Sequence, residues 1–298
     1  MSSSEFVSAI VNGLAFGFLL FLIAVGLSLV FGVMGILNLA HGAFFMLGAY
    51  FAYAFAGADS TPLWLFVPVM LGSGLVTAAI AAVLERVLFS RMYHREHLEL
   101  LVFMFALIFV GEGLVRLQWG PNPIVMTYPE GFSGSVGVFG ARVPQYSFLV
   151  IVAGLAVLAV LGYVLARTGV GYIIRAVAED SMMARALGLN VALVWTSVFA
   201  LGALLAGIGG TLVTPYQALS PQLGLAFLVQ AFAVVVVGGL DSIAGTLVAA
   251  ILLGLTNSFL VVTFSEWAPY SFYLGLIVVL LVRPQGLLGS KDLARQVG

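Results

Sequence analysis

The chain has 298 residues, of which 62% are hydrophobic and only 8% charged, and its mean hydropathy is +1.19. Several apolar stretches reach or exceed the roughly 20 residues that an α-helix needs to cross a bilayer core, which predicts an all-α, polytopic transmembrane helix bundle. A membrane β-barrel would instead show alternating polarity over segments of about 10 residues. The net charge of −1 gives no indication of nucleic-acid binding. The absence of cysteine excludes disulfides, thiolate metal sites and thiol catalysis, and it leaves the compartment undetermined.

In chain order, the first apolar runs lie near 6–31, 39–57 and 63–85. The opening MSSSEF lacks the basic region of a cleavable signal, so the first run is expected to be a retained span. Three full crossings would leave the N-terminus outside. The stretch FGVMGILNLAHGAFFMLGAY has no charge to place it in a loop, however, and it fits equally well a broken helix at mid-depth.

The basic residues gather in three segments, and such segments face the cytoplasm in membrane proteins. Two further arginines, Arg116 and Arg142, flank a Gly/Pro-rich stretch that predicts an outside loop with turns or a hairpin. The three segments hold nine of the eleven Lys and Arg residues: Arg86, Arg91 and Arg95; Arg167, Arg175 and Arg185; Arg283, Lys291 and Arg295.

One excursion out and back joins the first two basic segments, through spans near 98–118 and 146–166. An even number of spans must join the second and third, and two of these are short enough to be tilted or partly re-entrant. We therefore expect about eight spans in one domain that covers residues 1–298. The four later spans are expected near 192–214, 225–239, 243–264 and 271–283.

Small residues recur at near-helical spacing in two of the later runs, which predicts close helix packing. The first run contains Gly202, Ala206, Gly209 and Gly210, and the second contains Gly245, Ala249 and either Leu253 or Gly254.

Two glycine-containing breaks carry polar residues at membrane depth, where they cost desolvation free energy. In the first break, which ends in Gly42, Asn38 and His41 either line a polar path or pack inside the bundle, with the imidazole bonded to a backbone carbonyl. In the second break, Gly238 and Gly239 are expected to form a turn. Asp241 and Ser242 then follow at the position of a cap for the next helix.

Charged residues elsewhere in the chain give weaker signals. Glu112 and Arg116 are four positions apart on a predicted helix, so they are expected to form an ion pair; this pair is either structural or part of a polar translocation path. His94 and His97, with Glu96 and Glu99, resemble a metal cluster, but their basic cytoplasmic loop favours a solvated face. No P-loop, zincin motif, paired intramembrane aspartates or Gly-x-Ser-x-Gly elbow occurs, so an intramembrane enzyme has little support.

A charged, amphipathic segment, RTGVGYIIRAVAEDSMMARALGLNV, lies between long apolar runs over residues 167–191. A polar helix between membrane spans predicts a docking surface for a soluble partner. The sequence has no nucleotide-binding motif of its own, so any ATP-derived energy must come from another chain.

Five segments in this order resemble the LivH-type permeases of branched-chain amino acid ABC transporters: GILNLAHGAFFMLGAY, RLQWGPNP, RAVAEDSMMARALGLNV, VVVVGGLDSIAGTLVAAILLG and LVRPQGLLG. The resemblance covers nearly the whole chain. It implies that the charged segment carries a coupling helix, from about Arg175 to Leu187, that sits in a groove of an ATPase subunit. Asp241 stands where many relatives are expected to have a small residue, which leaves open whether this turn only caps a helix or acts as a gate or partner contact.

On this coupling helix the polar and apolar residues separate. Glu179, Asp180 and Arg185 would hold the helix at the aqueous boundary, together with Arg175 at its start. Gly188 is placed to end it in the left-handed conformation. The apolar strip expected to seat in the ATPase groove consists of Val177, Ala184 and Leu187.

The resemblance also implies partners and a mechanism. It implies a multi-pass protein of the bacterial inner membrane with no cofactor of its own, two ATPase subunits of the LivG and LivF type that hold ATP and Mg²⁺, a second permease of the LivM type, and a periplasmic substrate-binding protein. Transport would follow alternating access, with Asn38, His41 and Gly42 lining or gating the path. The substrate would be a branched-chain amino acid or a similar small polar solute, and the sequence does not fix the choice. The main rival is a stand-alone channel or secondary carrier for a solute such as urea or an amide, which would work without any ATPase.

Overall fold

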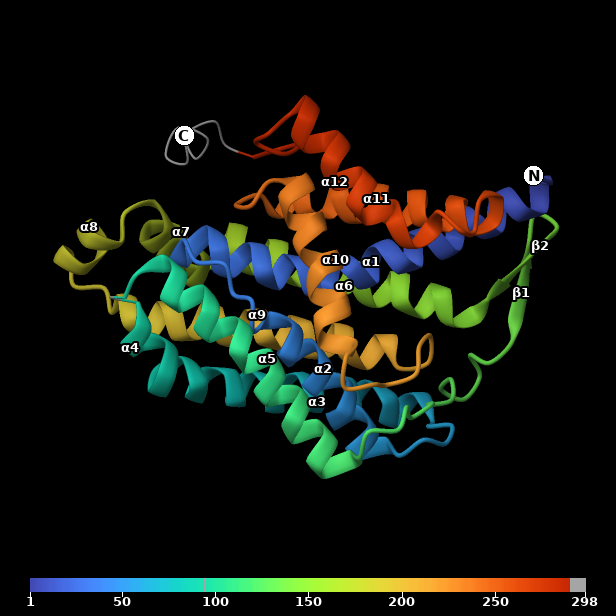
Figure 1. Cartoon of the computed structure of the whole chain (residues 1–298), viewed down its shortest axis with the longest axis horizontal. Helices are drawn as coiled ribbons and strands as arrows, with labels where there is room; N and C mark the ends of the chain where they lie inside the picture. The colour runs from blue at the N-terminus through green and yellow to red at the C-terminus, as the bar shows by residue number, and fades with distance from the viewer. Residues whose placement is uncertain (94, 290–298) are drawn as a thin grey trace.

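One long helix, α1 (Ser3–Met34), runs through the middle of the fold (Figure 1). Ser2 and Glu5 begin the helix as a capping box, in which each accepts a hydrogen bond from the backbone of the other, and Gly35 ends it at φ +68°. Every residue from Leu19 to Leu29 is buried, because other helices surround α1 on several sides. This computed structural model describes residues 1–93 and 95–289.

The remaining elements follow in chain order, and all but two strands are helical. After α1 they are α2 (His41–Ala56), α3 (Leu63–Leu84), the π-helical turn η1 (Glu85–Phe89), α4 (Ser90–Met92), α5 (His97–Trp119), β1 (Ser135–Val138), β2 (Ala141–Pro144), α6 (Gln145–Arg167), α7 (Gly169–Glu179), α8 (Ser181–Ala186), α9 (Val191–Val213), α10 (Leu223–Gly238), α11 (Ile243–Thr263), the 3-10 turn η2 (Ala268–Tyr270) and α12 (Ser271–Val282).

The predicted transmembrane bundle is confirmed, and its helices have two lengths. Six helices in the described residues are long and apolar enough to cross a membrane. Three shorter apolar helices, 41–56, 223–238 and 268–282, accompany them. A helix of 16 residues is about 24 Å long, which is less than the roughly 30 Å of a bilayer core. The short helices are therefore the broken or re-entrant segments that the sequence predicts.

The structure around the first break combines the two alternatives for the N-terminal region, which are three full crossings and a broken helix. The Nε2 of His41, the first residue of α2, lies 2.9 Å from the carbonyl oxygen of Ile23 in the middle of α1. Because α1 continues to Met34, residues 35–40 return along it by 11 positions, or about 16 Å. The chain therefore contains a broken helix at mid-depth. Helix α2 runs from this break toward the end of the molecule at which α1 begins, and α3 runs back from that end (Figure 1).

The two ends of the molecule along its long axis differ in the segments that they hold (Figure 1). Helices α4, α7 and α8, which carry or follow the first two basic segments, lie at one end, whereas the N-terminus and the β1–β2 hairpin lie at the other. This arrangement agrees with a cytoplasmic end and an outer end as the basic residues predict. In the third basic segment, Lys291 and Arg295 lie outside the described residues.

The Gly/Pro-rich stretch forms the predicted hairpin. Strands β1 and β2 pair antiparallel, with Ser135 opposite Pro144 and Val138 opposite Ala141. The two residues between the strands, Phe139 and Gly140, have φ values of +45° and +84°. Two successive positive φ values are typical of the two-residue turns that match the twist of a hairpin.

Glycines let the long helices approach closely, as their spacing predicts. A Cβ on Gly26 of α1 would lie 2.6 Å from the carbonyl oxygen of Gly202 in α9. A Cβ on Gly254 of α11 would lie 2.6 Å from the backbone nitrogen of Gly17 in α1. Such distances are too short for any side chain, so α9 and α11 pack backbone against backbone on α1.

The two glutamates among residues 94–99 face water, as expected for a solvated face: Glu96, just before α5, and Glu99, in its first turn, are both exposed. His94 lies outside the described residues. Among the residues that the structure does describe, no group of three or more His, Cys, Asp or Glu side chains is placed to hold a metal ion.

Candidate functional site

The charged segment 167–191 forms two helices instead of the single helix expected from Arg175 to Leu187. Helix α7 ends at Glu179, and α8 begins at Ser181. Asp180 separates them, because its carboxylate accepts hydrogen bonds from the backbone nitrogens of Met182 and Met183 at 2.9 and 2.8 Å. Aspartate side chains favour this capping geometry over a helix interior. The expected end of the segment is correct, since Gly188 adopts φ +85°.

The apolar side chains of this segment point to different places from those expected. Val177 and Ala184 are only 1% and 2% exposed, because they pack against the protein itself. Leu187 is 76% exposed, and it is joined by Met182 at 81% and Met183 at 57%. The exposed apolar surface of this segment is therefore the tip of α8, defined as Met182, Met183 and Leu187.

Charged residues surround the tip of α8 and extend along α7. Glu179 and Arg185 are exposed, as expected. Arg175 is also exposed, and its guanidinium lies 4.7 Å from the ring centre of Tyr172 while donating to the carbonyl oxygen of Leu165. The hydrogen bond ties α7 to the end of α6, whereas Tyr172 lies on α7 itself. The Asn190 side chain then caps α9 through the backbone nitrogen of Leu193, at 3.1 Å. The tip of α8 is thus only a few residues from a membrane-spanning helix.

The mid-membrane break is closed in this conformation. Asn38 and His41 are 1% and 0% exposed. The hydrogen bond from His41 to Ile23 is the backbone contact expected if the imidazole packs inside the bundle. Both amide atoms of Asn38 and the Nδ1 of His41 have no hydrogen-bond partner in the described part of the chain. Gly42 lies directly against Gly224 at the start of α10, so it is a packing contact between the two short helices.

The second break is a fastened turn. Ser242 caps α11, as expected, by accepting a hydrogen bond of 3.0 Å from the backbone nitrogen of Gly245. Gly239 has φ +109°, and Leu288 donates to the carbonyl oxygen of Gly238 at 3.0 Å. The hydroxyl of Ser28 in α1 donates to the carbonyl oxygen of Leu240 at 3.2 Å. The capping residue is therefore Ser242, and Asp241 is exposed beside it.

The expected ion pair on α5 forms, but loosely. Arg116 lies 3.9 Å from the carboxylate of Glu112, and the two side chains are 47% and 11% exposed. The arginine is therefore largely solvated, and a distance of 3.9 Å is longer than a hydrogen bond.

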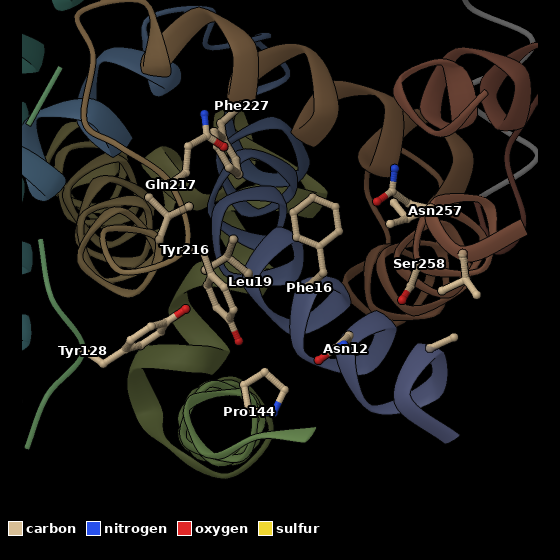
Figure 2. A pocket seen from close by; sticks show the side chains of 14 residues that line it. Asn12, Phe16, Leu19, Tyr128, Pro144, Tyr216, Gln217, Phe227, Asn257 and Ser258 are labelled. Carbon is tan, nitrogen blue, oxygen red and sulfur yellow. The ribbon is translucent and has the colours of Figure 1, made fainter. Parts of the chain in front are cut away.

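A cavity of about 560 Å³, which no pattern in the sequence predicts, lies near the end of the molecule that holds the N-terminus and the hairpin. Figure 2 shows α1 crossing its floor, with Asn12, Phe16 and Leu19 on that helix. Tyr216 and Gln217, which follow α9, lie on one side, and Asn257 and Ser258 of α11 lie on the other. Because these groups come from segments far apart in the sequence, no local motif could reveal the cavity.

Comparison with known proteins identifies the family. The family model described as "Branched-chain amino acid transport system / permease component" matches residues 9–282. The chain belongs to that family. It is 30% identical to the high-affinity branched-chain amino acid transport system permease protein BraD of Pseudomonas aeruginosa, over 98% of each chain. It is 29% identical to LivH of Escherichia coli over 97% of each chain, and 29% identical to LivM of the same organism over 90% of this chain and 67% of LivM.

This permease is therefore a multi-pass membrane transport subunit and not an enzyme, and the LivH resemblance of its five segments is confirmed. Membership in a family of transport-system permease components does not favour the stand-alone channel or carrier.

The permease also contains a buried carboxylate that the sequence did not single out. Glu85, in the π-helical turn η1, is 2% exposed and accepts hydrogen bonds from Tyr93 at 2.9 Å and from Thr196 of α9 at 2.6 Å. The pKa of Tyr93 lies far above its usual range because of burial, which is the largest cause, and the nearby charge of Glu85. The phenol therefore keeps its proton and remains a donor. A glutamate beside Arg86 at the end of an apolar run is a weak signal, because most charges at such ends are solvated.

Proposed function

We propose that this permease forms half of an ATP-driven importer for branched-chain amino acids or similar small polar solutes in the bacterial inner membrane. The observation that carries the proposal is the exposed apolar tip of α8, which stands among charged residues at the cytoplasmic end of a family permease. Methionine and leucine side chains of this kind seat well in a groove, and methionine adapts to its shape. The proposed occupant of this surface is an ATPase subunit.

The proposal assigns distinct roles to the two ends of the molecule along its long axis. Two ATPase subunits of the LivG and LivF type would bind ATP and Mg²⁺ and move α7 and α8. Since Arg175 fastens α7 to α6 and Asn190 caps α9, this motion would be transmitted directly into two spans. A periplasmic binding protein would deliver the solute at the outer end. The similarity of the chain to both LivH and LivM supports a pair of related permeases, in which the partner is of the LivM type.

Within the membrane, the proposed path passes the two breaks. The unpaired amide of Asn38 and the Nδ1 of His41 are expensive to keep buried and dry, so they support a role in a conformation that admits water. Gly42 would part from Gly224 in that conformation. Gly238, Gly239, Asp241 and Ser242 would act as the joint between α10 and α11, because the turn is fastened to α1 and to residues 287–288.

Reconstitution tests this function. Proteoliposomes that contain the two permeases and the two ATPases should take up labelled leucine when the binding protein is outside and ATP is inside. Omitting ATP, or the ATPase subunits, should abolish uptake. Uptake of leucine, urea or an amide by this chain alone, without ATPase subunits, would contradict the proposal and restore the stand-alone channel or carrier.

A further inference from the structure

Polar side chains from four separate segments line the outer cavity, and one of them is Tyr128 in the loop before β1. Asn12 lies on α1, Tyr216 and Gln217 follow α9, and Asn257 and Ser258 lie on α11. None of the described residues that line the cavity carries a formal charge. Amides and hydroxyls donate and accept hydrogen bonds, so this lining suits a polar group without net charge. An ion of one sign would lose hydration here without meeting a counter-charge.

Existing hydrogen bonds hold these polar groups in position. The Oδ1 of Asn12 accepts from Ser147 at 3.2 Å, and the Tyr216 hydroxyl donates to the same serine at 3.3 Å. The Nδ2 of Asn257 donates to the carbonyl oxygen of Ala268 and to the hydroxyl of Ser271, both at 2.9 Å. These bonds use both hydrogens of the Asn257 amide, which leaves its Oδ1 to accept from a solute. Figure 2 shows this oxygen on the side of Asn257 that faces Phe16.

The deeper side of the cavity is apolar and firmly supported. Leu19 and Phe227 line it and are almost fully buried, and Phe16 lies between the polar groups (Figure 2). The Phe227 ring stacks on Phe45 at 4.6 Å, and the Phe16 ring meets Phe272 edge to face at 6.0 Å. An aliphatic group placed here would leave water for a preformed apolar surface.

We propose that this cavity is an entry site of the permease for a small solute that has one polar head group of no net charge and one aliphatic body. The head group would lie against Asn12 and Asn257, and the aliphatic body would lie on Phe16, Leu19 and Phe227. The volume of about 560 Å³ admits such a molecule together with some water. The inference rests on the proposed import function, because it names the solute class that the outer half of the path receives.

Thiol labelling tests the site directly, since the chain has no cysteine of its own. Gln217 is exposed, and among the described residues it makes a hydrogen bond only through its backbone, which cysteine keeps, so Gln217→Cys in the assembled permease pair should fold and react with a small water-soluble maleimide. If leucine binds with a dissociation constant of about 1 mM, as suits a site that must release its solute, about 10 mM leucine should slow labelling about tenfold. Aspartate and lysine at the same concentration should leave the rate unchanged.

Three results of this labelling would overturn the proposal. Failure of the maleimide to reach Gln217→Cys would show that the cavity is closed to water or filled by lipid. No effect of leucine would show that the solute does not bind there. Equal protection by aspartate and lysine would show that the lining does not select against net charge. None of these results depends on ATP, whereas failure of the proposed import function would appear as missing ATP-driven uptake by the unsubstituted complex.

A space-filling variant provides an independent measurement. Val261 lines the cavity and is 55% exposed, so Val261→Trp should reduce the space without disturbing the core, and it should lower leucine uptake about tenfold or more. The matched control is Leu252→Trp on the same helix. Leu252 is 48% exposed, does not line the cavity and lies nine positions, or about 2.5 turns, away on the opposite face. Equal uptake by both variants would overturn the proposal.

Discussion

The hydroxyl of Thr196 donates a 2.6 Å hydrogen bond to the buried carboxylate of Glu85, and the two residues are 111 positions apart. This bond joins η1, which continues α3, to the first turns of α9. Helix α9 is the one that follows the tip of α8. The carboxylate accepts a second hydrogen bond from Tyr93, whose ring meets Trp195 edge to face at 5.5 Å. Two spans are thereby connected near the surface on which the ATPase is proposed to dock.

Removal of the Thr196 hydroxyl should weaken this connection. Thr196→Val keeps the shape of the side chain but leaves the buried carboxylate with one donor, so the free energy of unfolding should fall by about 1–3 kcal/mol. Thermal unfolding in detergent measures the change. Thr263→Val is the control, because Thr196 and Thr263 each also donate to the carbonyl oxygen four residues earlier, Ala192 and Phe259, and Thr263 is exposed. Equal losses of stability in the two variants would show that the bond to Glu85 contributes nothing of its own.

The tip of α8 should bind the ATPase without supporting the fold. Leu187→Asp or Met182→Asp places a charge on an exposed apolar surface, so the variants should stay folded but retain much less ATPase during co-purification. A loss of about tenfold in affinity corresponds to about 1.4 kcal/mol. Val136→Asp, on the exposed hairpin at the other end of the molecule, is the control.

Buried residues of the same segment should behave differently. Ala184 is 2% exposed, so Ala184→Trp should lower both stability and ATPase binding, and the loss of binding should follow the loss of folded protein. If the Leu187 and Met182 variants retain full ATPase binding and uptake, the tip of α8 is not the docking surface.

The Glu112–Arg116 pair should contribute little to stability. With the nitrogen and oxygen 3.9 Å apart and the arginine half-exposed, a double-mutant cycle should give a coupling free energy below about 1 kcal/mol. Glu112→Gln alone should leave the free energy of unfolding nearly unchanged. The variant loses the attraction to Arg116, but it also no longer has to bury a charged carboxylate. Uptake per folded molecule should be unchanged in the double variant Glu112→Gln with Arg116→Gln. Loss of uptake by this folded variant would place the pair in the translocation path.

Close glycine contacts should tolerate no added methyl group. Gly254→Ala introduces a carbon only 2.6 Å from the backbone of Gly17, so the helices must separate, and unfolding should require about 1–3 kcal/mol less. Gly162→Ala on α6 is the matched control, since a Cβ there meets no atom within 4 Å. That substitution should be neutral or stabilising, because alanine favours the helix. Thermal unfolding of both variants in one detergent makes the comparison.

The Asn38–His41 break should be reached by water only in some states of the transporter. Because both side chains are sealed in the described conformation, Asn38→Cys and His41→Cys should not react with water-soluble maleimide in that state. Trapping ATP on the complete transporter should make at least one of them reactive. Labelling that is absent in every nucleotide state would mean that both residues serve packing alone.

Some features of this permease follow from short stretches of sequence. The apolar runs, the hairpin at 135–144, the left-handed Gly188 and the Ser242 cap each depend on neighbours within a few residues, so local chemistry determines them. The order and spacing of the five characteristic segments indicate the family, because both are properties of the sequence itself.

Other features depend on which distant segments meet, and only the tertiary structure decides them. Asp180 could continue a helix or cap a new one, and the packing of Val177 and Ala184 on the protein left Met182 and Leu187 at the surface. Glu85 is joined to α9 only because the fold brings Thr196 to it. The outer cavity exists because α1, α11 and the segment after α9 converge. Burial and pairing are properties of long-range contacts, and a periodicity along one helix carries no information about its neighbours.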